Sequence, residues 1–178
     1  MEGITYRILA TGDIRLALFA GFRRKQNVAR CWRKIDDEWV IRDIAFIDDW
    51  TAEEYAEVTA SLHHTASTGG FVEGAFLGGA LKGFVAVERE PIGSLKQYLD
   101  LSIIMVSEEC RGMGIGGRLF DDAKLFARKM GAGKLYISAH SAVETQSFYR
   151  ALGCVEAEEY SREHVEKEPC DCQLECPV

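Results

Sequence analysis

Residues 110–120 read CRGMGIGGRLF and decide between two kinds of α/β fold. The stretch holds four glycines within six positions and directly precedes a run of residues with helical periodicity. Two phosphate-binding patterns overlap in it. One is G-x-G-x-x-G, which begins at Gly112 and is typical of dinucleotide-binding folds. The other is R-x-x-G-x-G, which begins at Arg111 and belongs to a different phosphate loop.

The dinucleotide interpretation predicts three features that the sequence does not have. A strand should run directly into the first glycine, the motif should come early in the domain, and an acidic residue about 20 positions later should hold the ribose. Here residues 107–111 separate the strand that ends at Val106 from Gly112, and the motif comes late in the chain. The next strand ends at His140, which is not acidic. The G-x-G-x-x-G match is therefore interpreted as coincidental.

The second pattern explains the same residues as a cradle for phosphate. Free backbone N–H groups and the positive end of the helix dipole face an anion that binds at a helix N-terminus. Glycine lets the backbone approach the anion closely and adopt a positive φ. The guanidinium of Arg111 adds a charge-assisted donor. The loop is therefore predicted to bind a phosphorylated ligand.

The composition fits one globular domain over residues 1–178. Of the 178 residues 47% are hydrophobic, and the formal net charge is −7. This acidity does not favour nucleic acid as a partner, and no apolar run is long enough to span a membrane. The N-terminus, MEGITYRILA, lacks the regions of a signal peptide. We therefore expect a cytoplasmic protein with no nucleic-acid or membrane partner.

The six cysteines do not indicate a disulfide framework or a metal site. Without a secretion signal, disulfides are not expected. Cys170, Cys172 and Cys176 lack the C-x-x-C pairs and the nearby histidines of common zinc sites. On a strand these three residues would share one face. We therefore expect no metal and interpret them as small strand side chains.

The order of predicted elements is mixed α/β, with antiparallel hairpins first and a strand-helix-strand-helix section after them. Residues 27–50 contain three tryptophans but no clean period, and Gly78-Gly79 predicts a hairpin turn. Capping boxes predict helix starts at Thr51 and Ser141. The predicted strands are residues 4–9, 71–77, 81–88, 96–106, 134–140 and one or two in the tail, around 154–160 and 170–177. The predicted helices are residues 13–25, 51–64, 115–130 and 141–152.

Two motifs in this order resemble the GNAT superfamily of N-acetyltransferases. The first is V-x-x-x-x-R-G-x-G-I-G, from Val106 to Gly116, and the second is F-Y-x-x-x-G-C, from Phe148 to Cys154. They lie about the family's usual distance apart, with the expected helix and strand between them. The resemblance is clear over residues 71–160. Residues 1–70 match only in the order of elements.

The resemblance implies a single-domain fold and a donor. The fold is a mixed sheet with antiparallel N-terminal strands, a splayed parallel pair in the centre and helices on both faces. Acetyl-CoA lies in the gap of the splayed pair in this family, so residues 71–160 would bind it and residues 1–70 would bind the acceptor. Ser141 lies beside the position where many members carry an asparagine for the cofactor arm, which here is Ala142. The residues that the resemblance assigns to acetyl-CoA are Ile104, Met105, Val106, Arg111, Gly112, Met113, Gly114, Ile115, Gly116, Gly117, Arg118 and Ser141.

The resemblance also implies a reaction, in which a primary amine attacks the acetyl thioester directly. Tyr149 occupies the position of the family's acid, which protonates the departing thiolate. Asp100, on the central strand, is the first candidate for the general base, and Glu73 or a water molecule are its rivals. A non-catalytic acyl-CoA-binding or sensor domain of the same fold is the alternative, but it would not need Tyr149.

The acceptor is expected to be a small-molecule amine, because the surface is acidic. A wall that would suit a cationic amine is one interpretation of the aromatic and acidic residues of the N-terminal third, and an aromatic core with solvated acids is the other. These residues are Trp32, Trp39, Trp50, Asp36, Asp37, Asp48 and Asp49. A homodimer through a sheet edge, which is common among similar proteins, is left open.

Overall fold

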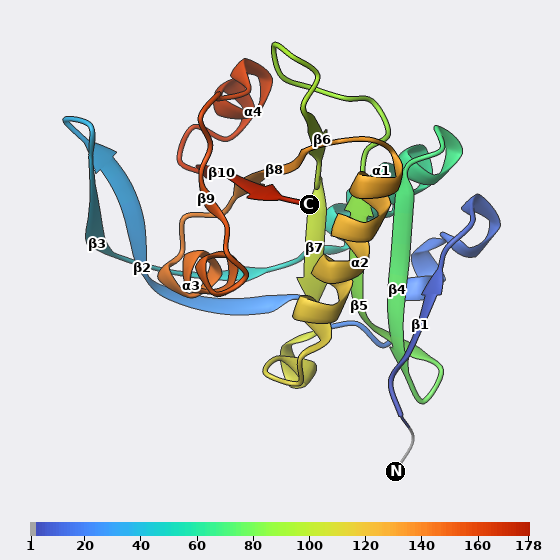
Figure 1. The fold of residues 1–178 in the computed structure, drawn as a ribbon. Helices are drawn as coiled ribbons and strands as arrows, with labels where there is room; N and C mark the ends of the chain where they lie inside the picture. Colours follow the sequence, from blue (N-terminus) through green and yellow to red (C-terminus); the bar gives the residue numbers. More distant parts are fainter. Residues whose placement is uncertain (1–2) are drawn as a thin grey trace.

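The computed structural model describes residues 3–178, and its strands form two four-stranded sheets and a separate hairpin (Figure 1). The first sheet has the order β1 (Thr5–Ile8), β4 (Phe71–Leu77), β5 (Ala80–Val87), β7 (Ile103–Val106). The second has the order β6 (Tyr98–Asp100), β8 (Lys134–Ala139), β10 (Cys172–Pro177), β9 (Val155–Glu156). The hairpin consists of β2 (Lys25–Ile35) and β3 (Glu38–Asp49). The helices are α1 (Ala52–Ser67), α2 (Ile115–Lys129), α3 (Val143–Ala151) and α4 (Arg162–Lys167).

The predicted strand 96–106 is divided between the two sheets. Its first part, β6, pairs in parallel with β8, so that Asp100 lies opposite Tyr136. Its second part, β7, pairs antiparallel with β5 on its other side. The chain changes partner at Leu101 and Ser102, and beyond that point β7 and β8 separate. This splayed parallel pair confirms the predicted fold class, although the sequence predicted one continuous strand.

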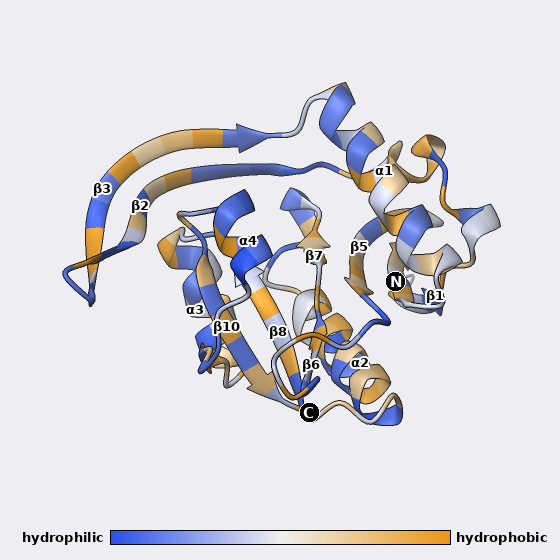
Figure 2. Cartoon of the chain, turned by 90° about the horizontal axis from the view of Figure 1, so that it is seen from above, coloured by the Kyte–Doolittle hydropathy of each residue, from blue (hydrophilic) through white to orange (hydrophobic). Residues whose placement is uncertain are grey.

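Helices cover both faces of the first sheet, as Figure 2 shows for α1 and α2 on either side of β5. Leu119 of α2 belongs to the same buried cluster as Val85 and Val87 of β5. Leu62 of α1 packs instead in the cluster that contains Phe84. Because successive side chains of a strand point to opposite faces, one strand contributes to both cores. The near-continuous apolar run of β5 follows from this double burial.

The prediction of a helix over residues 13–25 is wrong. The segment forms two short 3₁₀ turns, Thr11–Asp13 and Leu16–Phe19, and then enters β2. Ile14, Phe19 and Phe22 are buried, whereas Leu16 is exposed. The buried residues pack against side chains of β4 and β5. A Cβ at Gly21 would meet the Cβ of Ala80 at 2.9 Å, so the backbone itself packs against the sheet there. Tertiary packing thus overrides the local helical pattern.

Residues 27–50, which showed no clean period, form most of the long β2–β3 hairpin. Figures 1 and 2 show it as a curved two-stranded arm that extends beyond the two sheets. Its register shifts between Val28 and Arg30, which breaks the alternation of side chains along the strand. The arm is tied to the segment between β8 and α3, where Trp32 N–H donates to the Ser141 carbonyl at 2.8 Å. The irregular register explains why residues 27–50 show no regular strand period in the sequence.

The other helix boundaries test the predicted caps. At α1 the capping box is confirmed, because the Thr51 hydroxyl accepts from Glu54 N–H and the Glu54 carboxylate accepts from Thr51 N–H. The capping box at Ser141 is wrong, since α3 begins after Ala142 without a side-chain cap. Ser141 is buried instead, and its hydroxyl accepts a hydrogen bond from Arg33 at 2.6 Å.

Candidate functional site

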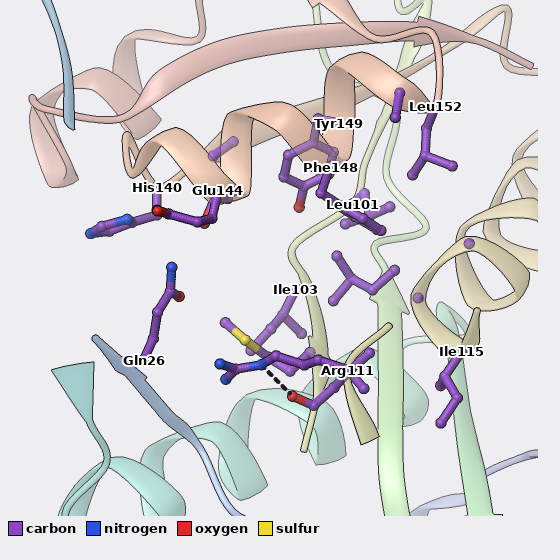
Figure 3. Close-up of a pocket in the computed structure, with 18 of the residues that line it drawn as sticks. Gln26, Leu101, Ile103, Arg111, Ile115, His140, Glu144, Phe148, Tyr149 and Leu152 are labelled. Carbon is purple, nitrogen blue, oxygen red and sulfur yellow. Dashed lines mark hydrogen bonds between the residues drawn. The ribbon is translucent and has the colours of Figure 1, made fainter. Parts of the chain in front are cut away.

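A cavity of about 820 Å³ opens where β7 and β8 separate, and Figure 3 shows many of the side chains that line it. It is bounded on one side by β7 and on the other by the end of β8 and α3. Side chains from both cores reach it. Ile104 packs toward the α2 side of the sheet, whereas Met105 packs toward the α1 side. The cavity therefore has access to both faces of the sheet, and its volume suits a cofactor-sized ligand.

The glycine loop forms one end of this cavity. Gly112 and Gly114 have φ values of 77° and 80°, in the left-handed region that favours glycine. A Cβ at either position would meet no atom within 4 Å, so the backbone conformation, not crowding, selects glycine there. Gly114 is the N-cap of α2, which has 15 residues. Ile115, Gly116 and Gly117 of the first turn line the cavity, and the first N–H groups of a helix have no partner within the helix, as an anion site at a helix N-terminus requires.

Arg111 lies at the same end. Its Nε donates to the main-chain oxygen of Val106 at 3.4 Å, which Figure 3 marks with a dashed line. The side chain is exposed, and in Figure 3 its guanidinium extends away from Ile115 of α2 and toward Gln26 of β2. A guanidinium that opens onto the cavity is suited to a phosphate or pyrophosphate group.

The edge of β7 provides main-chain groups along the cavity. Among the strands of residues 3–178, β7 is the last of its sheet and pairs only with β5. The edge that faces β8 is therefore free to pair with an extended ligand that contains amides. All three predicted residues of this strand, Ile104, Met105 and Val106, line the cavity.

The Tyr149 hydroxyl points into the cavity from α3 (Figure 3). The residue is only 6% exposed, and no hydrogen-bond partner for its hydroxyl occurs among residues 3–178. Burial raises the pKa of Tyr149, and the neighbouring Cys154 and Asp171 add to this effect. The hydroxyl therefore stays protonated at neutral pH and can donate a proton or a hydrogen bond to a ligand.

Most of the predicted site residues come together at this cavity. The ten that line it are Ile104, Met105, Val106, Arg111, Gly112, Gly114, Ile115, Gly116, Gly117 and Tyr149. Met113 is 53% exposed and lies outside the lining. Arg118 also lies outside; it pairs with Asp122 at 2.6 Å. Ser141 is held by Arg33 and does not reach the cavity either.

The structure does not bring Asp100 to the cavity, which corrects its predicted role as the general base. Its carboxylate lies 3.0 Å from Nε2 of His164 in α4 and points away from the gap between β7 and β8. Its other oxygen, Oδ1, is buried without a partner. Because Asp100 ends β6, just before the chain changes sheets, its side chain faces α4 and not the splayed region.

Glu73, the second candidate for the base, is equally remote. It lies on β4 beneath α2 and does not line the cavity. Burial and the neighbouring Asp122 raise its pKa to about 7, whereas Arg118 opposes the shift. The raised pKa of Glu73 therefore comes from its own burial and from a neighbouring carboxyl group, both outside the cavity.

The tryptophan and aspartate residues do not form a wall around the cavity. Trp32 packs beneath the guanidinium of Arg150, at 4.5 Å from its ring centroid, and Trp50 packs edge-on against Tyr55. Asp48 forms an ion pair with the buried Arg24. None of the three tryptophans lines the large cavity; Trp32 and Trp39 line a separate one of about 90 Å³. The packing supports the other interpretation, packed aromatic residues with solvated acids, because Asp36, Asp37 and Asp49 are exposed.

Several lining residues were not predicted. They form a polar section at the end of β8 and along β2: Arg24, Gln26, Asn27, Ser138, His140, Glu144 and Asp171. In the sequence, His140 stands out only as the residue that ends a predicted strand, and Asp171 is not singled out. No local signal marks them, because three segments far apart in the sequence supply them.

Two findings concern ligands and membranes in the described part of the chain. Within residues 3–178, no group of three or more His, Cys, Asp or Glu side chains is placed to hold a metal ion. No helix in that range has the length and hydropathy that crossing a membrane requires.

We compared the chain with known protein families and with solved structures. The model of the acetyltransferase (GNAT) family matches residues 32–154. No curated protein sequence matches the chain.

Solved structures are similar over nearly the whole chain. A nourseothricin acetyltransferase superposes with a TM-score of 0.70 at 19% identity, covering 98% of each chain. A Bacillus anthracis protein, provisionally described as a streptothricin acetyltransferase and solved with acetyl coenzyme A, gives 0.67 at 18% identity, covering 97% of this chain and 96% of its own. A GNAT family acetyltransferase from Elizabethkingia anophelis with acetyl-CoA bound gives 0.59 at 16% identity, covering 100% of both. At these identities the likeness concerns the fold.

Proposed function

Because this chain belongs to the acetyltransferase (GNAT) family, we propose that it transfers the acetyl group of acetyl-CoA to the primary amine of a small molecule. The reaction is a direct attack of the amine on the thioester. The observation that carries the proposal is the cavity between β7 and β8, which has a phosphate cradle at one end and the Tyr149 hydroxyl in its wall.

The residues at the cavity fit acetyl-CoA in order along its length. The loop from Arg111 to Gly117, with the N-terminus of α2, offers N–H donors and one guanidinium to the pyrophosphate. The free edge of β7 offers main-chain groups to the amides of the pantetheine arm. The thioester then lies where the two strands come together, near Tyr149.

Tyr149 acts as the acid. When the amine attacks, the carbon–sulfur bond breaks and the sulfur leaves as a thiolate, which needs a proton. Burial keeps the Tyr149 hydroxyl protonated, and the hydroxyl has no protein partner among the described residues that would compete for it. Help of this kind is worth about 100- to 10,000-fold in rate.

A small molecule is favoured as the acceptor by the names of similar structures. The first of them is a nourseothricin acetyltransferase, and the second carries a streptothricin description. The cavity has polar walls from β2 and β8 on the side away from the glycine loop, which suits a polar amine.

Ligand binding is tested first by thermal shift with acetyl-CoA, CoA and NAD. Acetyl-CoA at 100 times its dissociation constant should add about 2.7 kcal/mol to the free energy of unfolding. Stabilisation by NAD alone would overturn the assignment of the loop.

Catalysis is tested by thiol release and mass spectrometry with acetyl-CoA and a panel of amines: nourseothricin, kanamycin, spermidine and lysine. An increase of 42 Da in one amine is the mass of the added acetyl group and identifies the acceptor. Binding of acetyl-CoA without transfer to any of a wide set of amines would favour the alternative, a non-catalytic acyl-CoA sensor domain.

A further inference from the structure

The polar section of the cavity contains a carboxylate that the sequence did not single out. Asp171 precedes β10, whose first residue, Cys172, pairs with Ala139 of β8. This register places Asp171 beside His140, just beyond the end of β8. The residue lines the cavity together with Tyr149. A carboxylate and a phenol from different elements are thus brought to one space.

One oxygen of Asp171 is held and the other is free. Oδ2 accepts a hydrogen bond from the Ser138 hydroxyl at 3.2 Å, and Gln173 in turn donates to that hydroxyl at 3.0 Å. Oδ1 has no hydrogen-bond partner among residues 3–178 and is not one of the polar atoms sealed from solvent. The side chain is therefore oriented by Ser138 and presents an unused acceptor to the cavity.

The groups around Asp171 set its affinity for protons. Burial raises its pKa, and the nearby Glu168 acts in the same direction. His140, the hydrogen bond from Ser138 and His164 oppose this shift. Tyr149 faces the same space, and the charge of Asp171 contributes to the raised pKa of that tyrosine. A carboxylate in this setting accepts a proton more readily than a solvated one.

The other titratable groups near the cavity are less suited to accept a proton. Asp100 is occupied by His164 and does not reach the cavity. Nδ1 of His140 accepts from Ala142 N–H at 3.1 Å, so Nε2 carries the hydrogen of the neutral ring and acts as a donor. Glu144 is exposed in the first turn of α3. Figure 3 shows His140 and Glu144 on the α3 side of the cavity, with Gln26 opposite them.

We propose that Asp171 binds the ammonium group of the acceptor and takes its proton before the attack. This inference rests on the proposed function and assigns the base of that reaction. Ser138 is a positioning residue, which holds Oδ2 so that Oδ1 meets the amine. His140, through Nε2, offers a hydrogen bond to a neutral acceptor group beside the ammonium.

The protons balance as follows. The ammonium gives one proton to Asp171 and becomes a neutral amine, whose lone pair forms the carbon–nitrogen bond. The carbon–sulfur bond breaks, and Tyr149 gives its proton to the sulfur. The nitrogen then loses a second proton, which restores the Tyr149 hydroxyl. Asp171 releases its proton to water, so each turnover yields the amide, free CoA thiol and one proton.

The test compares Asp171→Asn with the matched variant Glu168→Gln, which removes an exposed carboxylate three residues away that does not line the cavity. With the best amine of the panel, Asp171→Asn should lower kcat/KM for the amine about 100-fold at pH 7. The loss should shrink as the pH rises toward 10, because the amine then arrives deprotonated. Glu168→Gln should keep the wild-type kcat/KM at pH 7 and move the acidic limb of the pH profile slightly downward, because the Glu168 charge raises the pKa of Asp171.

Two further measurements separate a catalytic role from a structural one. The acetyl-CoA dissociation constant of Asp171→Asn should equal that of the wild type, which shows that the fold and donor site are intact. Ser138→Ala should lower the rate less and move the acidic limb of the pH profile upward, since Asp171 loses a bond to its charged form.

The proposal is overturned if Asp171→Asn keeps the wild-type rate and pH profile, or if its loss of rate is the same at every pH. A wild type that transfers acetyl to no amine contradicts the proposed function itself. That outcome differs from an active wild type whose activity does not depend on Asp171.

Discussion

The carboxylate of Asp100 lies 3.0 Å from Nε2 of His164 and connects the end of β6 to α4. The helix has six residues, none of them buried, so few other contacts hold it. The His164 ring also stacks on Tyr136, at 5.4 Å between centroids. His164 thus connects α4 to Asp100 of β6 and Tyr136 of β8 in the second sheet.

The pair predicts a dependence of stability on pH. The hydrogen bond to Asp100 raises the pKa of His164 above its ordinary 6.5. The folded state therefore binds the proton more tightly than the unfolded state. The contribution of protonated His164 to the free energy of unfolding is complete below about pH 6.5. It is lost as the pH rises through the pKa that His164 has in the folded state. His164→Gln should reduce the free energy of unfolding by about 1 kcal/mol or less at pH 6 and by a smaller amount at pH 8.5.

Denaturant unfolding at several pH values measures this effect. His63→Gln is the matched control, since His63 is exposed on α1. An equal change in both variants would show that the Asp100–His164 pair contributes nothing specific.

Glu73 predicts a second dependence, in a more acidic window. Its pKa is raised to about 7 by burial and by Asp122, and its Oε2 is buried without a partner. A carboxyl group with a raised pKa in the folded state lowers stability as the pH rises between 4.5 and about 7. Glu73→Gln should therefore increase the free energy of unfolding on the order of 2 kcal/mol at pH 8 and little at pH 4.5.

Chemical denaturation of Glu73→Gln and of Glu57→Gln, an exposed residue on α1, checks this prediction. If both variants have the wild-type free energy of unfolding at pH 8, the ionised Glu73 carboxylate does not destabilise the folded protein as its burial implies.

One glycine lies at each end of α2, and comparing the two distinguishes the effect of a glycine on stability from its effect on ligand binding. Gly114 begins the helix at φ 80° and Gly131 follows its end at φ 85°, and a Cβ at either would meet open space. Gly114→Ala and Gly131→Ala should each cost about 1–2 kcal/mol of stability, because alanine is strained in this region. Only Gly114→Ala should weaken acetyl-CoA binding, which isothermal titration calorimetry measures. Equal acetyl-CoA affinities in the two variants would argue against the loop as the phosphate cradle.

Tyr149→Phe tests the proposal that the Tyr149 hydroxyl protonates the departing thiolate. The variant should keep the acetyl-CoA affinity and lose about 100-fold in kcat, since it removes a hydroxyl that has no partner in residues 3–178. Tyr160→Phe, at the exposed end of the second sheet, is the control for the loss of a hydroxyl elsewhere. Unchanged turnover of Tyr149→Phe under saturating substrates would remove Tyr149 from the mechanism.

Arg24 lines the cavity and depends on one partner. It is 4% exposed, pairs with Asp48, and its Nε and Nη1 are buried without partners. Asp48→Asn should destabilise the protein by about 1–3 kcal/mol, because the guanidinium then lacks its counter-charge. Asp49→Asn, which changes the adjacent exposed carboxylate, should be nearly neutral in thermal unfolding. Similar melting temperatures for both variants would contradict this account of Arg24.

The local signals that were confirmed are those with a short-range physical cause. The glycines of residues 110–120 predicted a positive-φ loop before a helix, and Gly112 and Gly114 adopt it. The hairpin at Gly78-Gly79 and the capping box at Thr51 are also confirmed. Each depends on the backbone preferences of a few adjacent residues.

The predictions that failed depended on distant parts of the chain. The helix expected over residues 13–25 is replaced by turns where Gly21 packs on Ala80. Ser141 begins a sequence pattern that is typical of a capping box, but its hydroxyl accepts a hydrogen bond from Arg33 of the β2–β3 arm instead. In both places a tertiary contact outweighs a local preference.

The sequence by itself determined the family and the conformation of the glycine loop that we propose as the phosphate cradle, because such a loop is built from consecutive residues whose backbone conformations are local. Only the tertiary structure decided where the acidic groups lie. It directs Asp100 toward α4, buries Glu73 under α2 and brings Asp171 from the C-terminal strand to the cavity. The side on which a carboxylate emerges depends on strand register and on where the central strand changes sheets, and both are set by pairing between distant segments.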